Sequence, residues 1–138
     1  MLPLIVRACV VRRAAATFSR SRLASVLSAR APPSPAITNL YMEAGALSPK
    51  DLIADIKSGF YVTELIGMGV NGVTGDYSRG AAGFWIENGE IAYPVSEVTI
   101  AGNLKDMFLH LTPANDLAFK YGANAPTCRV EGMTIAGA

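Results

Sequence analysis

The side chains best suited to bind a transition metal or to act as nucleophiles are few in this sequence of 138 residues. Its cysteines are Cys9 and Cys128, and its one histidine is His110. These residues form neither a C-x-x-C pair nor an H-E-x-x-H helix, the spacings that bring several ligands to one zinc ion. We therefore expect no metal site and no catalytic residue within this chain.

Cys128 and His110 are expected to have structural roles. Cys128 follows Thr127 and precedes Arg129 and Val130, an alternation typical of a strand, and a lone buried thiol behaves as a small apolar group. We expect His110 on a polar or partly exposed helix face. A serine nucleophile at Ser78 would need both His110 nearby and a G-x-S-x-G turn that leads into a helix, and the sequence around Ser78 lacks that turn.

A glycine-rich segment begins with Gly67-Met-Gly-Val-Asn-Gly72, which matches the dinucleotide-binding pattern G-x-G-x-x-G. That pattern binds a pyrophosphate only where a helix begins, because the free N–H groups and the helix dipole attract the anion. The residues that follow, Val-Thr-Gly-Asp-Tyr-Ser-Arg-Gly80, are not typical of a helix. We therefore expect no nucleotide site, and interpret the glycines as positions for β-bulges or for close approach of another backbone.

Two short helices are predicted in the second part of the chain. Ser48-Pro49-Lys50-Asp51 combines an N-cap serine, a proline at the first helical position and an acid in the first turn, which predicts a helix from Pro49 to a stop at Gly59. Asn103 is predicted to cap a second helix, whose apolar residues follow helical spacing and which ends at Thr112-Pro113. These apolar residues are Leu104, Met107, Phe108 and Leu111.

The remaining elements are predicted to be strands. Asn88-Gly89 between two apolar, β-rich runs, Phe84–Glu87 and Glu90–Tyr93, predicts a hairpin, because both turn positions of type I′ require positive φ. For that reason we expect Gly89→Val to destabilise the fold more than Gly45→Val. Further strands are expected at 39–43, 60–66, 93–100 (with an edge or bulge at Pro94), 117–121, 127–131 and 133–136. The fold class expected is α+β: a mostly antiparallel β-sheet or half-open barrel with two short helices.

The chain joins two different compositions. Residues 1–37 contain six arginines and neither lysine, glycine nor acid, whereas residues 38–138 contain six basic and eleven acidic residues and all 13 glycines. Ala31-Pro-Pro-Ser-Pro35 is typical of a stiff linker. We therefore expect a domain at 38–138, preceded by an Arg-rich leader at 1–37 that is unrelated to it or poorly ordered.

The leader has three interpretations. It can be a segment that is not native to the protein, through a misassigned start, a frame shift or a fusion; it can be an organellar targeting segment; or it can be an arm that contacts an anionic partner. Arg7 interrupts the apolar start, so it is too short to span a bilayer, and we expect no membrane association. In residues 38–138 the basic residues are scattered without interleaved aromatic residues, and we expect no nucleic-acid binding.

One long stretch of the sequence closely resembles part of a known protein family. Residues 67–90, from Gly-Met-Gly-Val-Asn-Gly to Trp-Ile-Glu-Asn-Gly-Glu, and residues 93–107, Tyr-Pro-Val-Ser-Glu-Val-Thr-Ile-Ala-Gly-Asn-Leu-Lys-Asp-Met, closely resemble the C-terminal end of the TldD/PmbA family. The likeness runs from about Thr38 to the final residues and favours a PmbA/TldE-type subunit, of which it covers only the C-terminal portion. Residues 1–37 do not resemble the family.

The resemblance implies a cytoplasmic heterodimeric zinc metallopeptidase, historically called a modulator of DNA gyrase. In it, a TldD-type catalytic subunit holds zinc through an H-E-x-x-x-H helix and a C-terminal cysteine, and the complex trims peptides and unfolded chains. This chain lacks the helix, and Cys128 falls at a different place from the family's ligand. The resemblance therefore implies a subunit with no cofactor of its own, the zinc being in the TldD-type partner.

Within such a subunit, we expect the glycine-rich segment to touch a peptide substrate or the partner. Its polar members are Asn71, Thr74, Asp76, Ser78 and Arg79. Glycines let another backbone approach a strand edge and add a strand through main-chain hydrogen bonds. Alternatively, the glycines serve only the curvature of the sheet. The chain can also be a stand-alone β-rich binding module, or a non-functional gene remnant without peptidase activity.

Overall fold

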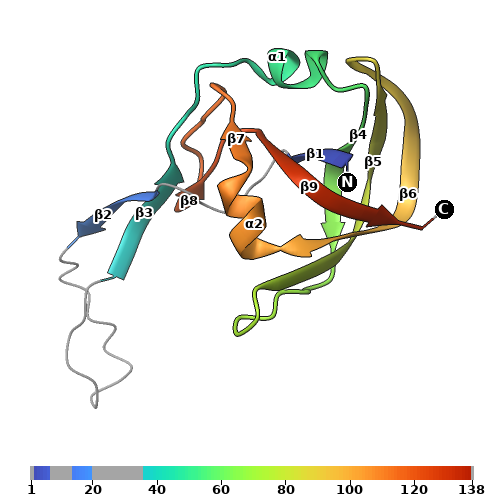
Figure 1. Cartoon of the computed structure of the whole chain (residues 1–138). Helices are drawn as coiled ribbons and strands as arrows, with labels where there is room; N and C mark the ends of the chain where they lie inside the picture. The colour runs from blue at the N-terminus through green and yellow to red at the C-terminus, as the bar shows by residue number, and fades with distance from the viewer. Residues whose placement is uncertain (1, 7–13, 20–35, 138) are drawn as a thin grey trace.

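The computed structural model describes residues 2–6, 14–19 and 36–137. Figure 1 shows a curved main sheet, a second small sheet beside it and two short helices. The strands are β1 (Leu2–Val6), β2 (Ala14–Ser19), β3 (Ala36–Met42), β4 (Ser58–Ile66), β5 (Asp76–Glu87), β6 (Glu90–Asn103), β7 (Leu111–Pro113), β8 (Ala123–Asn124) and β9 (Cys128–Ala136), and the helices are α1 (Pro49–Ala54) and α2 (Leu104–Leu109).

The main sheet has six strands in the order β1-β4-β5-β6-β9-β7, and β1 pairs with β9 as well. Most of its pairings are antiparallel, and β1 with β4 is the parallel one. β6 meets β9 only at residues 99–101, so the curled sheet stays open along the rest of β6. The predicted fold class, a mostly antiparallel, half-open α+β structure with two short helices, is confirmed.

The inside of the curved sheet holds the larger apolar core. Its fully buried members come mainly from β4, β6 and β9, with Phe60, Ile100, Val130 and Met133 among them, and also include Met42 of β3 and Ala81 of β5. Trp85 of β5 packs on Phe60 with ring centroids 6.3 Å apart. A second apolar cluster packs α1 against the main sheet. Its members are Leu52, Ile53, Ile56 and Ile86, together with Ile5 and Ala114. Successive side chains of β4 and β5 point to opposite faces of the sheet, so the side chains of one face lie in this interior.

Two local predictions are confirmed. α1 begins at Pro49 with Ser48 as N-cap, and Ser48 and Asp51 form a reciprocal capping box. Asn88 and Gly89, with φ of 49° and 82°, form the turn between β5 and β6. Pro94 also lies where expected, next to a register shift and on a stretch of β6 with no second neighbour among the described strands.

Several predicted boundaries are wrong. α1 ends at Ala54, and Gly59 lies inside β4 instead of ending the helix. α2 ends at Leu109, because Leu111–Pro113 pairs with β9 as strand β7. Residues 117–121 form no strand, and the two strands predicted at 127–131 and 133–136 are one strand, β9, whose Gly132 takes a φ of 78°.

The Arg-rich leader contains two of the described strands. β1 lies in the main sheet, and β2 pairs with β3 and, through it, with β8 in the small sheet. Residues 36 and 37 of the leader already belong to β3, the rest of the leader lies outside the described residues, and the domain boundary after residue 37 stays a prediction. Within the described part of the chain, no helix is long and apolar enough to cross a membrane.

Candidate functional site

The glycine-rich segment forms the end of the β4–β5 hairpin. β4 stops at Ile66 and β5 starts at Asp76, and the connection folds back on itself before β5 begins. Val70 bridges Tyr77 in antiparallel fashion, and the N–H of Ser78 donates to the carbonyl of Gly69 over 2.7 Å. The segment is therefore a hydrogen-bonded extension of the hairpin.

Asn71 organises the tip of this extension. Its Oδ1 accepts hydrogen bonds from the backbone N–H groups of Val73 (2.9 Å) and Thr74 (3.3 Å), the pattern of an Asx turn. Its own N–H donates to the carbonyl of Asp76 over 2.8 Å, and its carbonyl accepts from Gly75 over 2.8 Å. The side chain and the main chain of Asn71 thus close the turn from both sides.

Thr74, Asp76 and Asn103 form a second set of contacts at the base of the turn. The Thr74 hydroxyl donates to Asp76 Oδ2 over 2.6 Å, and Asn103 Nδ2 donates to Asp76 Oδ1 over 3.3 Å and to the carbonyl of Thr74 over 3.1 Å. The hydrogen bond from Thr74, followed by that from Asn103, lowers the pKa of Asp76 below its ordinary value of 3.8. Asp76 is therefore a carboxylate at neutral pH and orders the turn.

Ser78 and Arg79 lie outside this network. The Ser78 side chain is exposed on β5. Arg79 is half-buried, and its Nη2 donates to the carbonyl of Leu65 on β4 over 3.3 Å, while its Nε is buried and has no partner. The structure thus gathers Asn71, Thr74 and Asp76 and leaves the other two expected site residues along the strand.

The glycines of this region serve two different purposes. A Cβ at Gly69 would overlap the carbonyl oxygen of Ser78, and one at Gly83 would overlap that of Tyr61, so both glycines permit close packing within the hairpin. In contrast, a Cβ at Gly67 or Gly72 would meet nothing within 4 Å. Of these four glycines, Gly67 and Gly72 therefore have open space beside them, and Gly69 and Gly83 do not.

The tip also carries apolar side chains in an exposed position. Met68 is fully exposed, Val73 is 96% exposed, and Ile66 and Val70 are more than half exposed. Their backbone is held by the Asn71 turn and the Val70 bridge. The polar members of the segment were predicted from the sequence as candidate site residues, whereas these apolar side chains were not.

The potential zinc ligands do not come together. His110 is the exposed C-cap of α2, with its Nδ1 2.9 Å from the carbonyl of Asp106. Cys128 is fully buried at the start of β9, where its Sγ is 3.5 Å from Met42 Sδ and 3.3 Å from the carbonyl of Pro126. Within the described ranges, no three His, Cys, Asp or Glu residues could hold a metal ion, and the donors there do not fit a zinc site. Cys9 lies outside these ranges.

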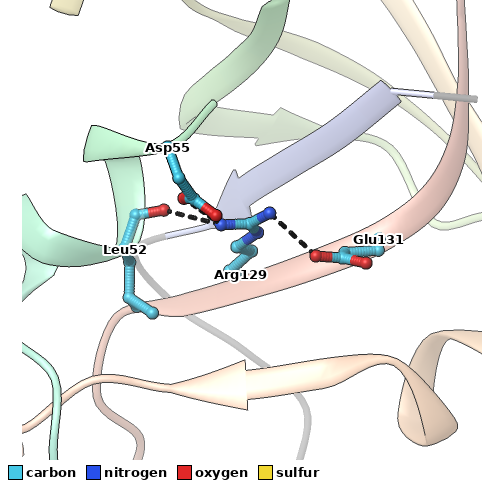
Figure 2. A network of polar contacts seen from close by, with 4 residues as sticks. All are labelled: Leu52, Asp55, Arg129 and Glu131. Atoms are coloured by element: carbon cyan, nitrogen blue, oxygen red, sulfur yellow. Dashed lines mark hydrogen bonds and ion pairs between the residues drawn. The ribbon is translucent and has the colours of Figure 1, made fainter. Parts of the chain in front are cut away.

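A second polar site lies between α1 and β9 and was missed from the sequence (Figure 2). Arg129 reaches the carbonyl of Leu52 over 3.3 Å, Asp55 Oδ1 over 2.5 Å and Glu131 Oε1 over 2.8 Å. It lines a shallow pocket of about 210 Å³. The only signal in the sequence was a charged residue between two apolar ones in a predicted strand, and nothing nearby indicated its partner Asp55.

Comparisons with known proteins add what the geometry alone does not provide. The family model described as the PmbA/TldA metallopeptidase C-terminal domain matches residues 12–137, and this match begins inside the Arg-rich segment. The metalloprotease PmbA of Escherichia coli O157:H7 is 49% identical over 102 residues, which cover 73% of this chain and 23% of that protein. A TldD homologue of Haemophilus influenzae is 36% identical over 104 residues, which cover 75% of this chain and 21% of that protein.

Solved structures show the same fold. TldE from Thermococcus kodakarensis is 25% identical with a TM-score of 0.65, over 75% of this chain and 25% of that one. A Bacteroides thetaiotaomicron protein, described as a proposed modulator of DNA gyrase, is 35% identical with a TM-score of 0.69. The match covers 78% of this chain and 25% of that one. The chain therefore spans about a quarter of the length of these relatives.

Proposed function

Because this chain belongs to the PmbA/TldA metallopeptidase C-terminal domain family, as its glycine-rich string predicted, we propose that it supplies the C-terminal domain of a PmbA/TldE-type subunit. In this role it binds no metal, pairs with a TldD-type catalytic subunit that holds the zinc, and helps to enclose a peptide or an unfolded chain in the cytoplasm. The complete reaction requires parts that are absent from these 138 residues.

The exposed apolar tip of the β4–β5 hairpin is the observation that carries this proposal. Met68 and Val73 are almost completely exposed, on a turn whose backbone is held by Asn71, Thr74 and Asp76. Exposed apolar clusters with a polar rim are typical of protein-binding surfaces. A turn that is already ordered loses little conformational entropy when it binds, which favours a docking role over a solvent-exposed loop.

The polar residues of the hairpin fit contacts with a peptide or with the partner. Asn71, Thr74, Asp76, Ser78 and Arg79 lie in the same hairpin as Gly67 and Gly72, the two glycines whose Cβ positions are open. Another backbone can approach there without a steric clash, and hydrogen bonds to the main chain give affinity with little sequence preference. Gly69 and Gly83, in contrast, act within the hairpin.

Binding of a purified TldD-type subunit tests the partner role. We expect a paired substitution, Met68→Ser with Val73→Ser, to weaken binding at least tenfold in a calorimetric titration. Leu109→Ser with Phe119→Ser is the control, because those side chains are 55% and 65% exposed elsewhere on the surface. Equal loss in both variants, or no binding by the unmodified chain, would favour a stand-alone binding module or a gene remnant.

Zinc dialysis and a peptide-cleavage assay test the non-metal role. The chain alone should bind no zinc tightly and cleave no peptide, because catalytic zinc needs three protein ligands and an open position. Stoichiometric sub-micromolar zinc binding that disappears in His110→Ala or Cys128→Ser would contradict the proposal. Cleavage that requires both this chain and the TldD-type subunit would support it.

A further inference from the structure

Strand β1 fills a gap between two strands that come from distant parts of the chain. It runs parallel to β4, with Leu4 opposite Phe60 and Val6 opposite Val62. Its other edge is antiparallel to β9, where the same two residues lie opposite Val130 and Cys128. Figure 1 shows β1 lying against β4 and β9. Both edges of a five-residue segment are therefore paired.

The gap has an apolar pocket for one side chain of the strand. Ile5 is completely buried and belongs to the cluster that holds Leu52, Ile56 and Ile86. Leu52 lies on α1, Ile56 follows that helix and Ile86 lies on β5, so the cluster that holds Ile5 extends beyond its two partner strands. Filling such a pocket removes a whole aliphatic side chain from water, and an unfilled pocket would leave its lining without packing partners.

On its β4 side, the gap has room for the main chain of β1 to approach closely. A Cβ at Gly59 would lie 2.8 Å from the carbonyl oxygen of Pro3 and 2.8 Å from Ile56 Cγ2. Glycine at this position of β4 therefore leaves room for β1, which a larger residue would push outward. The site thus combines two hydrogen-bonding edges, an aliphatic pocket and space for backbone, which are the requirements for recognising an extended segment.

We propose that the gap between β4 and β9 is a strand-acceptor site for an extended apolar segment, and that Leu2–Val6 of the same chain occupies it. The main-chain edges recognise any extended backbone, and the Ile5 pocket selects an aliphatic side chain at one position. A free peptide with the same pattern therefore competes with Leu2–Val6 for the site. The Arg-rich segment, on this basis, contributes a strand to the domain that follows it.

The test uses the full chain with Ile5→Asn, which places an amide in the apolar pocket, and Ile91→Asn as control, because Ile91 is 51% exposed. We expect the first variant to lower the thermal midpoint by roughly 10 °C and the second to change it by at most about 3 °C. An acetylated, amidated peptide of residues 2–6 should restore the midpoint of the Ile5→Asn chain in a saturable way. The same peptide with Asn in place of Ile should not.

Amide hydrogen exchange of the unmodified chain provides a second measurement, which holds even if the variant fails to fold. The amides of Leu4 and Val6 should exchange as slowly as those of Phe60 and Val62, their neighbours in the sheet. Fast exchange in β1, or equal midpoints for the two Asn variants, would overturn the proposal. A concentration-dependent dimer in light scattering would also overturn it, because a second copy would then supply the strand.

Discussion

The side-chain amide of Asn103 donates a hydrogen bond to the carboxylate of Asp76, its register partner across β5 and β6, over 3.3 Å. The same amide group caps α2, because its Oδ1 accepts the N–H of Lys105 over 3.1 Å. One side chain therefore joins the glycine-rich turn to the start of a helix. The ordering of the proposed docking tip and the position of α2 depend on the same residue.

Asn103→Ala should destabilise the chain by about 1–2 kcal/mol, since it removes a helix cap and two donors to the turn. Asn103→Asp separates these effects: the carboxylate can still cap the helix, but it donates nothing and repels Asp76. We expect Asn103→Asp to retain α2 in circular dichroism and to accelerate amide exchange at Val73 and Thr74. Unchanged exchange in the turn would show that Asn71 and the Thr74–Asp76 hydrogen bond order it without Asn103.

The acid titration of Asp76 should depend on Thr74. Its hydrogen bonds to Thr74 and Asn103 lower the folded-state pKa below the ordinary 3.8, so this carboxyl stabilises the fold above the unfolded pKa, and that stabilisation is lost as pH falls through the folded pKa. Thr74→Val removes the larger cause and should raise the pKa of Asp76 toward 3.8. Carboxyl ¹³C NMR measures this shift. Asp51 is the reference, because Ser48 lowers its pKa and the Thr74→Val change should leave it unaltered.

Glycine substitutions should distinguish positions that exclude a side chain from positions that tolerate one. Gly89→Ala should cost about 1–2 kcal/mol, because φ is 82° and the new Cβ would lie 2.6 Å from the carbonyl oxygen of Ala54. Gly72→Ala is the control: its Cβ meets nothing within 4 Å, so the change should stay within about 0.5 kcal/mol. Urea unfolding measures both, and equal losses would contradict the turn geometry.

Gly45 has a steric constraint that the sequence did not indicate. The smaller cost expected for Gly45→Val than for Gly89→Val stays a prediction. In the structure, a Cβ at Gly45 would overlap the carbonyl oxygen of Pro113, so this position also excludes a side chain. The constraint comes from a chain segment far away in sequence, and no local pattern could indicate it.

Features determined within a few neighbouring residues could be predicted. The Ser48 N-cap and the Asn88-Gly89 turn each depend on contacts over at most three residues or on local φ, and both predictions are confirmed. Residues 117–121 show the opposite case. Their composition favours a strand, but Asn124 Oδ1 accepts the N–H groups of Lys120 and Tyr121, which a strand would use in its ladder.

The candidate site was predictable only in part, for the same reason. Asn103 was recognised as a helix cap, since that role involves Lys105 nearby. Its contacts with Thr74 and Asp76 cross 29 and 27 residues and depend on how β5 and β6 are registered. Pairing register results from the whole sheet, so the residues of the turn could be named from the sequence but their connections could not.

Arg129 should stabilise the attachment of α1 to β9 mainly through its bond to the backbone. Its side chain is only 16% exposed, whereas its partners Asp55 and Glu131 are 70% and 54% exposed and remain hydrated if the cation is removed. Exposed ion pairs contribute little, and salt screens them. The bond to the carbonyl of Leu52 is less accessible to salt, and its loss leaves a helix-terminal acceptor without its partner.

We therefore expect Arg129→Met to cost about 1–2 kcal/mol in urea unfolding, and Asp55→Asn to cost less than about 0.5 kcal/mol. Raising the salt concentration to about 1 M should abolish the effect of Asp55→Asn and leave most of that of Arg129→Met, because the Debye length falls to about 3 Å. Methionine retains the apolar stem, so lost packing does not explain the difference. Equal costs for the two variants, with equal salt dependence, would instead show that the ion pairs hold α1 in place.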